Sequence, residues 1–234
     1  MRCFSSLVLL VFCCAPASAD GVRELTRERA FAWGPALKQS AIFLGIQHGF
    51  RVGFQSGTRE QLKGPFLRDW GRSIKGLSGW KDGDPALVNY VGHPVQGAVS
   101  GYIYVQNAPG AAAREFSFTG PYWRSRLMAT AWNAAYSTQY EIGPFSDAAI
   151  GNVGLRPGTK GAVDLVITPV LGMAWMVTED ALDRHLAARL ENRIKARWVN
   201  ALVRTWINPS RSMANVLRGE APWHRDTRPG LWKR

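Results

Sequence analysis

Apolar residues recur at helical spacing along most of the chain, and alternation typical of β-strands is rare. The run Tyr102–Val105 alternates too briefly to indicate a strand. Prolines at the first turn mark several helix starts. The pattern predicts a mainly α protein, a helical bundle with kinked apolar helices, which we expect to be membrane-associated. The predicted helices cover residues 22–33, 35–56, 65–77, 85–107, 121–142, 162–191 and 210–218.

Proline and glycine predict where these helices bend or end. Pro94 and Pro169 lie inside predicted helices and should kink them, whereas Asp84 should cap the helix that begins at Pro85. The helix over 162–191 has no clear stop signal and is open to continuation as far as Trp206. Residues 143–160 are rich in glycine, so we expect a long loop, and Asp147 lies in it.

Three predicted helices each carry one narrow polar stripe with spacings of three and four, which places each stripe on one helix face. A narrow stripe on an apolar helix favours a polar seam between helices and an apolar exterior. The alternative is that each stripe is the solvent-facing side of its helix. The predicted seam residues, beside the three considered next, are Asn89, Gln96, Ser100, Arg126, Asn133, Ser137 and Thr168.

His93, Glu141 and Asp164 are the candidate catalytic residues, one on each striped helix. A histidine beside a helix bend, facing an acid, is suited to general-base chemistry or to ion binding. The alternative is a histidine satisfied by one hydrogen bond in a packed core. The common zinc-ligand spacings are absent, so the sequence predicts no metal site, and it does not identify a cofactor.

The amino terminus resembles a secretory signal peptide. Arg2 precedes the apolar run Leu7–Phe12, and Ala17–Ala19 forms an Ala-x-Ala cleavage signal. The run is shorter than the roughly 20 residues that span a bilayer, although an uncleaved anchor is the alternative. Cleavage after Ala19 would remove all three cysteines, since these lie within the first fourteen residues. We therefore expect export to the periplasm or outer envelope.

The chain has 29 basic and 17 acidic residues, and +8 of its net charge of +12 lies in residues 181–234. Tryptophans interleave with these basic residues, which favours contact with anionic lipid. A solvated charged face is the alternative, and nucleic acid is a less available partner for an exported protein. The residues expected to contact lipid are Arg193, Lys195, Arg197, Arg204, Trp198 and Trp206.

Four short elements occur in order over about 85–219. They are His93-Pro94 with Gly97, Tyr140-Glu141, Asp164-Leu165 with Thr168-Pro169 and Gly172, and Asn208-Pro209 with Arg211. In these elements the chain resembles an uncharacterised family of bacterial envelope proteins, although it lacks that family's Gly-Glu after Gly172. The resemblance implies an envelope location and no particular chemistry.

The sequence thus predicts a signal peptide over 1–19, N-terminal helices over 20–80, a helical core over 81–219 and a basic tail over 220–234. No nucleophile elbow or phosphate-binding loop occurs. We expect an exported, membrane-associated envelope protein with a structural or lipid-handling role. The alternatives are a lipid-directed hydrolase or transferase using His93 with an acidic partner, and a polyanion-binding module formed by the basic C-terminal region.

Overall fold

The computed structural model describes residues 30–54, 56–149 and 161–232, and all regular structure in these ranges is helical. The predicted mainly α fold and helical bundle are confirmed. Residues Phe31–Arg234 form one compact unit. The predicted signal peptide and residues 22–29 of the predicted helix over 22–33 lie outside the described residues.

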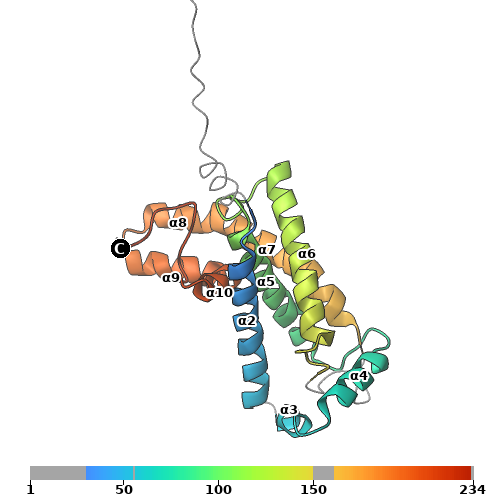
Figure 1. Cartoon of the computed structure of the whole chain (residues 1–234). Helices are drawn as coiled ribbons and strands as arrows, with labels where there is room; N and C mark the ends of the chain where they lie inside the picture. The colour runs from blue at the N-terminus through green and yellow to red at the C-terminus, as the bar shows by residue number, and fades with distance from the viewer. Residues whose placement is uncertain (1–29, 55, 150–160, 233–234) are drawn as a thin grey trace, which may run out of the picture. The chain divides into compact units, whose positions relative to one another are not determined.

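Three helices form the centre of the bundle, and each contacts the other two (Figure 1). They are α5 (His93–Asn107), α6 (Gly120–Ile142) and α7 (Val163–Leu182). Helix α2 (Trp33–Phe54) packs along α5, and Asn107 Nδ2 donates to Gln39 Oε1 over 2.8 Å. Contacts therefore cross the predicted boundary between residues 80 and 81.

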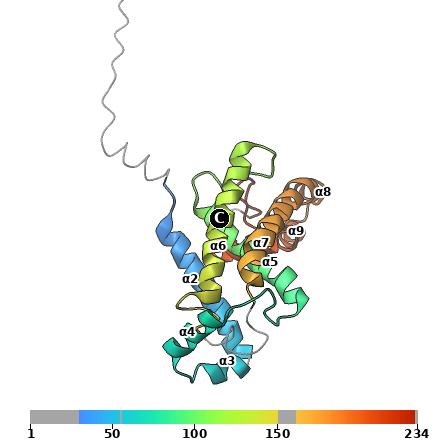
Figure 2. The same cartoon turned by 90° about the vertical axis from the view of Figure 1, so that its right-hand side faces the viewer.

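Shorter helices flank this centre at its two ends (Figure 2). Figure 2 shows α3 and α4 at one end and α8 and α9 at the other. Two π-helical segments, η1 and η2, precede α5 and α8. The bounds of these elements are α3 Ser56–Gln61, α4 Phe66–Gly76, η1 Val88–Gly92, η2 Asp183–Ala187, α8 Ala188–Arg193, α9 Arg197–Ile207 and α10 Pro209–Leu217.

At the kink predicted near Pro94, the structure has the π-helical turn η1. The N–H of His93 bonds the Val88 carbonyl, one residue further back than in an α-helix. Pro94 has no N–H, and its ring would clash with the carbonyl four residues earlier. A wider π-turn accommodates such a site. By contrast, Pro169 lies within the continuous helix α7.

Two predictions about helix ends are wrong. The helix after residue 162 does not reach Trp206, because the backbone is extended at Ile194. A separate helix, α9, begins at Arg197. Asn200 Nδ2 donates to the Ile194 carbonyl over 3.0 Å and stabilises this break. At the start of η1, the acid that accepts the local hydrogen bonds is Asp82 rather than Asp84.

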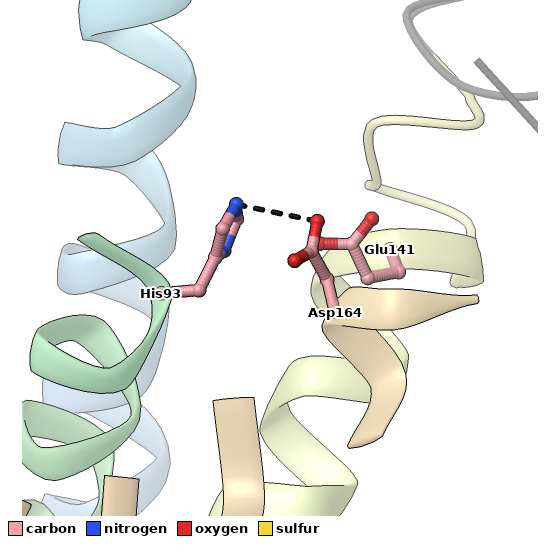
Figure 3. Close-up of side chains that lie close together, drawn as sticks. All are labelled: His93, Glu141 and Asp164. Carbon is pink, nitrogen blue, oxygen red and sulfur yellow. Dashed lines mark ion pairs between the residues drawn. The ribbon is translucent and has the colours of Figure 1, made fainter. Parts of the chain in front are cut away.

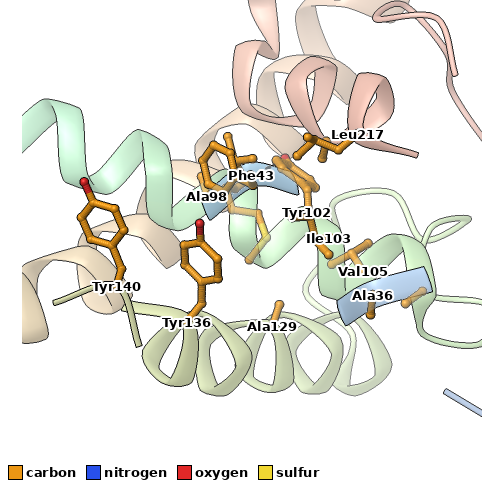
Figure 4. Packing of buried hydrophobic residues seen from close by; sticks show 14 residues of the cluster. Ala36, Phe43, Ala98, Tyr102, Ile103, Val105, Ala129, Tyr136, Tyr140 and Leu217 are labelled. Carbon is orange, nitrogen blue, oxygen red and sulfur yellow. Dashed lines mark hydrogen bonds between the residues drawn. The ribbon is translucent and has the colours of Figure 1, made fainter. Parts of the chain in front are cut away.

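The apolar core lies where α2, α5, α6 and α10 meet, and it mixes small residues with aromatic ones (Figure 4). The small residues let helix backbones approach closely. A Cβ atom on Gly97 would lie 2.3 Å from the Thr168 carbonyl oxygen, and one on Gly172 would lie 3.0 Å from the Cα of Gly97. Helices α5 and α7 therefore cross with backbone nearly touching backbone, which fixes the positions of the polar residues that they carry.

Candidate functional site

The three polar stripes face one another inside the bundle. His93, Asn133 and Ser137 are each at most 2% exposed, and Gln96 is half-buried against Gln47, whose Nε2 donates to Gln96 Oε1 over 2.8 Å. The stripes are therefore not solvent-facing. The other seam residues that are buried are Asn89, Ser100, Arg126, Glu141, Asp164 and Thr168.

Hydrogen bonds from side chains to backbone tie α6 to α7 along this seam. Asn133 Nδ2 donates to the Thr168 carbonyl over 3.0 Å, and Ser137 Oγ donates to the Asp164 carbonyl over 3.2 Å. These bonds position the backbone at the start of α7. They leave the Asp164 carboxyl free to face another helix.

The ends of three helices bring His93, Glu141 and Asp164 together (Figure 3). His93 is the first residue of α5, Glu141 lies one residue before the end of α6, and Asp164 is the second residue of α7. His93 Nε2 lies 3.2 Å from Asp164 Oδ2. One possible ligand atom from each residue lies within 4.8 Å of the others, and all three side chains are buried.

Burial dominates the electrostatics of this cluster. Burial, with Arg51 nearby, lowers the pKa of His93 to about 4. Burial and a hydrogen bond shared with the Asp82 carboxyl raise the pKa of Asp164 to about 8. Burial and the neighbouring Asp147 and Asp164 also raise the pKa of Glu141. His93 is therefore neutral at neutral pH and a weaker general base than one whose pKa is near 7.

Asp82 belongs to this cluster, although no motif or spacing in the sequence singles it out. Its Oδ1 accepts a hydrogen bond from Asn89 Nδ2 over 2.8 Å and one from the Asp84 N–H over 3.0 Å. Asp82 also lines a cavity of about 400 Å³ together with Asn89 and Val163. The carboxyl of Asp82 therefore lies between this cavity and Asp164.

Arg51 and Asp147 form a buried ion pair beside the cluster, with 2.5 Å between Arg51 Nη2 and Asp147 Oδ2. Arg51 Nε also donates to the Tyr140 hydroxyl over 2.9 Å. Asp147 lies in the predicted loop but is buried, because its carboxyl is the counter-charge that a mostly buried arginine requires. An arginine beside the apolar residues Phe50 and Phe54 was the only sequence signal for this pair.

Arg126 belongs to a second buried polar group, centred on Asp180. Arg126 Nε donates to Asp180 Oδ2 over 2.7 Å, and the side chains of both residues are fully buried. Tyr102 and Tyr122 donate their hydroxyls to the same carboxylate, and Arg211 pairs with it as well. Arg126 therefore does not face His93, although both residues lie in the predicted seam.

The basic C-terminal region is partly neutralised inside the protein. Arg204 is only 3% exposed, and two of its nitrogens donate to the Glu191 carboxylate over 2.9 and 2.7 Å. The prediction that Arg204 contacts lipid is therefore wrong. Arg225 pairs with Asp183, so residues beyond the predicted boundary at 219 and 220 also pack onto the bundle. The exposed members of the predicted lipid-contacting set are Arg193, Lys195, Arg197, Trp198 and Trp206.

The ion pairs of Asp183 should make the stability of the protein fall in acid. Burial alone would raise its pKa, but Arg225, Arg211 and Arg228 outweigh burial and lower the pKa from 3.8 to about 2. The ionised carboxylate therefore stabilises the fold above its ordinary pKa, and this contribution of about 2 kcal/mol is lost as the pH falls to about 2. Between about pH 5 and pH 2, the unfolding free energy of the parent should fall about 2 kcal/mol further than that of Asp183→Asn. Equal pH slopes in chemical denaturation would contradict this.

Comparison with known proteins does not identify a function for this cluster of residues. The chain matches no protein-family model, and it shows no significant similarity to a curated protein or to a solved structure.

Proposed function

We propose that this chain is an exported, membrane-associated envelope protein with a structural or lipid-handling role. The observation that supports this most directly is the outer face of α9. Trp198, Leu202 and Trp206 follow one another at intervals of four residues, and they are 65%, 48% and 78% exposed. A helix that exposes two tryptophans and a leucine on one face has the pattern of an interfacial membrane helix.

Basic residues lie beside this apolar face. Arg193 ends α8, Lys195 lies in the break that follows, and Arg197 begins α9, and all three are exposed. None of the three forms a salt bridge among the described residues. They therefore remain available to lipid phosphates, while the tryptophans suit the headgroup layer.

Helix α2 has a similar distribution of large apolar side chains on its outer side. Polar side chains such as Gln39 and Gln47 are buried there, while Leu37 and Phe50 are 57% and 62% exposed. Soluble monomers rarely expose large contiguous apolar patches. Helix Val163–Arg193 is also long and apolar enough to cross a membrane, a property that it shares with core helices of soluble proteins.

Vesicle flotation tests the proposal with two sets of variants. The full chain should float with vesicles that contain phosphatidylglycerol, and raised salt should weaken the binding. Replacing Arg193, Lys195 and Arg197 by glutamine should weaken binding on the order of 100-fold, since each basic residue near an anionic surface contributes about 1 kcal/mol. The double variant Trp198→Ala, Trp206→Ala should bind more weakly at every salt concentration.

Phe145→Ala is the matched control, because Phe145 is an aromatic residue that is 70% exposed and lies outside α9. This variant should bind vesicles as the parent does. If the parent stays with the soluble fraction at low salt, or if Phe145→Ala weakens binding as much as the α9 variants do, the proposed membrane face is wrong.

A lipid-directed hydrolase or transferase is the second candidate function. Two observations favour it: His93 lies 3.2 Å from Asp164, and a cavity of about 400 Å³ adjoins Asp82. The low pKa of His93 weighs against its action as an unaided base. Turnover of a lipid ester that Asp164→Asn abolishes, with vesicle binding unchanged, would distinguish this candidate from the first.

A further inference from the structure

We infer that His93, Glu141 and Asp164 form a binding site for one divalent transition-metal ion. The inference is independent of membrane contact, since it concerns the interior of the bundle. It goes beyond the sequence, which contains no zinc-ligand spacing because each of the three residues belongs to a different helix.

The geometry of the three side chains suits a shared ion. Zn²⁺ binds imidazole nitrogen and carboxylate oxygen at about 2 Å, so the donor atoms of one ion lie roughly 3.3 Å apart. His93 Nε2 and Asp164 Oδ2 already have this separation, at 3.2 Å. The Glu141 carboxylate lies beside Asp164 in Figure 3, and its ligand atom is within 4.8 Å of the other two. Rotation of the Glu141 side chain would bring its carboxylate oxygen close enough to bind the same ion.

Two atoms of the cluster, His93 Nε2 and Asp164 Oδ1, are buried and have no hydrogen-bond partner among the described residues. His93 is 1% exposed, yet its Nε2 has no partner with hydrogen-bond geometry, although the ring points at Asp164 (Figure 3). Asp164 Oδ1 is likewise buried and unpartnered. Unsatisfied buried polar atoms are costly and rare. A metal ion would satisfy the imidazole nitrogen and the carboxylates together.

The charges around the cluster point to a cation. Among the described residues, no lysine or arginine lies within 4 Å of the carboxylates of Asp82, Glu141 or Asp164, because the nearby Arg51 pairs with Asp147 instead. A dication would displace the carboxyl protons of Glu141 and Asp164 and balance the two resulting carboxylates beside a neutral histidine. Buried carboxylates commonly occur either in ion pairs or as metal ligands.

The donor set selects the class of metal. One imidazole nitrogen with two carboxylates suits Zn²⁺, Mn²⁺ or Fe²⁺ better than Ca²⁺ or Mg²⁺, which prefer oxygen alone. Three protein ligands leave a coordination position open, as in catalytic zinc sites. Asp82 shares a hydrogen bond with Asp164 and would orient that ligand from outside the site. The cavity that Asp82 lines would let a ligand approach the ion from the Asp82 side.

Metal binding to the purified full chain tests the inference. Cys3, Cys13 and Cys14 are replaced by serine in every version, so that thiolates do not compete for the ion. After stripping with EDTA, the parent should take up one Zn²⁺ or Mn²⁺ per chain, measured by elemental analysis and by competition with a chelating dye. Glu141→Gln and Asp164→Asn should each weaken binding by more than about 100-fold, since loss of an outer partner alone costs about 10- to 100-fold.

Two matched controls separate the site from general effects. His224→Ala removes a half-buried histidine that faces Glu220 and Asp226, and Glu179→Gln alters a buried glutamate that accepts backbone N–H groups of α10. Both variants should bind metal as the parent does. If the parent takes up neither ion, or if Glu141→Gln and Asp164→Asn bind as tightly as the parent, the inference is wrong. If a variant fails to fold, the absorption spectrum of Co²⁺ bound to the parent still shows whether the site exists.

Discussion

Gly97→Ala should destabilise the protein by about 3 kcal/mol, the upper end of the usual cost of overpacking a core. The added Cβ would lie 2.3 Å from the Thr168 carbonyl oxygen and 2.7 Å from Asn133 Nδ2. A backbone oxygen within a helix cannot rotate away, so α5 and α7 would have to separate. That separation would also disturb the hydrogen bond from Asn133 to Thr168. Chemical denaturation followed by circular dichroism measures the loss.

Gly45→Ala is the matched control for this prediction. Gly45 lies inside helix α2, and a Cβ there would have no atom within 4 Å. Alanine favours a helix interior over glycine by up to about 1 kcal/mol, so Gly45→Ala should be neutral or stabilising. A similar effect of the two substitutions would show that the crossing of α5 and α7 is not as close as described.

Asp180→Asn should destabilise the protein by about 3–5 kcal/mol, the usual cost of removing one partner of a buried ion pair. The substitution keeps the volume of the side chain but removes its charge. Arg126, whose side chain has no exposed surface, would then have no counter-charge, and Arg211 would lose its contact with the same carboxylate. Thermal and chemical unfolding of the variant beside the parent measure the effect.

Asp226→Asn serves as the comparison for Asp180. Asp226 pairs with Arg218 over 2.9 Å, but its side chain is 32% exposed. Exposed ion pairs contribute about 0–1 kcal/mol, so this substitution should change stability by no more than that. If Asp180→Asn has an equally small effect, the group around Asp180 does not support the bundle as proposed.

The helices could be predicted from the sequence because hydrophobic periodicity and proline positions are local signals. The spacing of Asn89, His93, Gln96 and Ser100 placed them on one face, and the structure buries that face. The π-turn before His93 was predictable only as a bend, because the local sequence does not specify which backbone hydrogen bond of the helix is lost. The break at Ile194 has no proline or glycine to mark it.

Pairings between distant residues were the part that the sequence did not reveal. Arg51 and Asp147 are 96 positions apart, and Asp82 reaches Asp164 across 82 positions. Charge counts treat the basic C-terminal residues alike, yet Arg204 and Arg225 are buried in ion pairs while Arg193 and Arg197 remain exposed. Burial, which only tertiary packing determines, separates a structural arginine from one that is available to a partner.

If the proposed membrane face of α9 is correct, Leu202 lies at the lipid surface, and a probe at this position measures that contact. With the three native cysteines replaced by serine, Leu202→Cys is labelled with a polarity-sensitive fluorophore, and Glu115→Cys, at an exposed acidic residue outside α9, serves as the reference. On phosphatidylglycerol vesicles the probe at position 202 should shift to the blue and be quenched by brominated lipid chains, while the probe at position 115 stays unchanged. An unchanged spectrum at position 202, with vesicles in excess, would show that this face of α9 does not bind lipid.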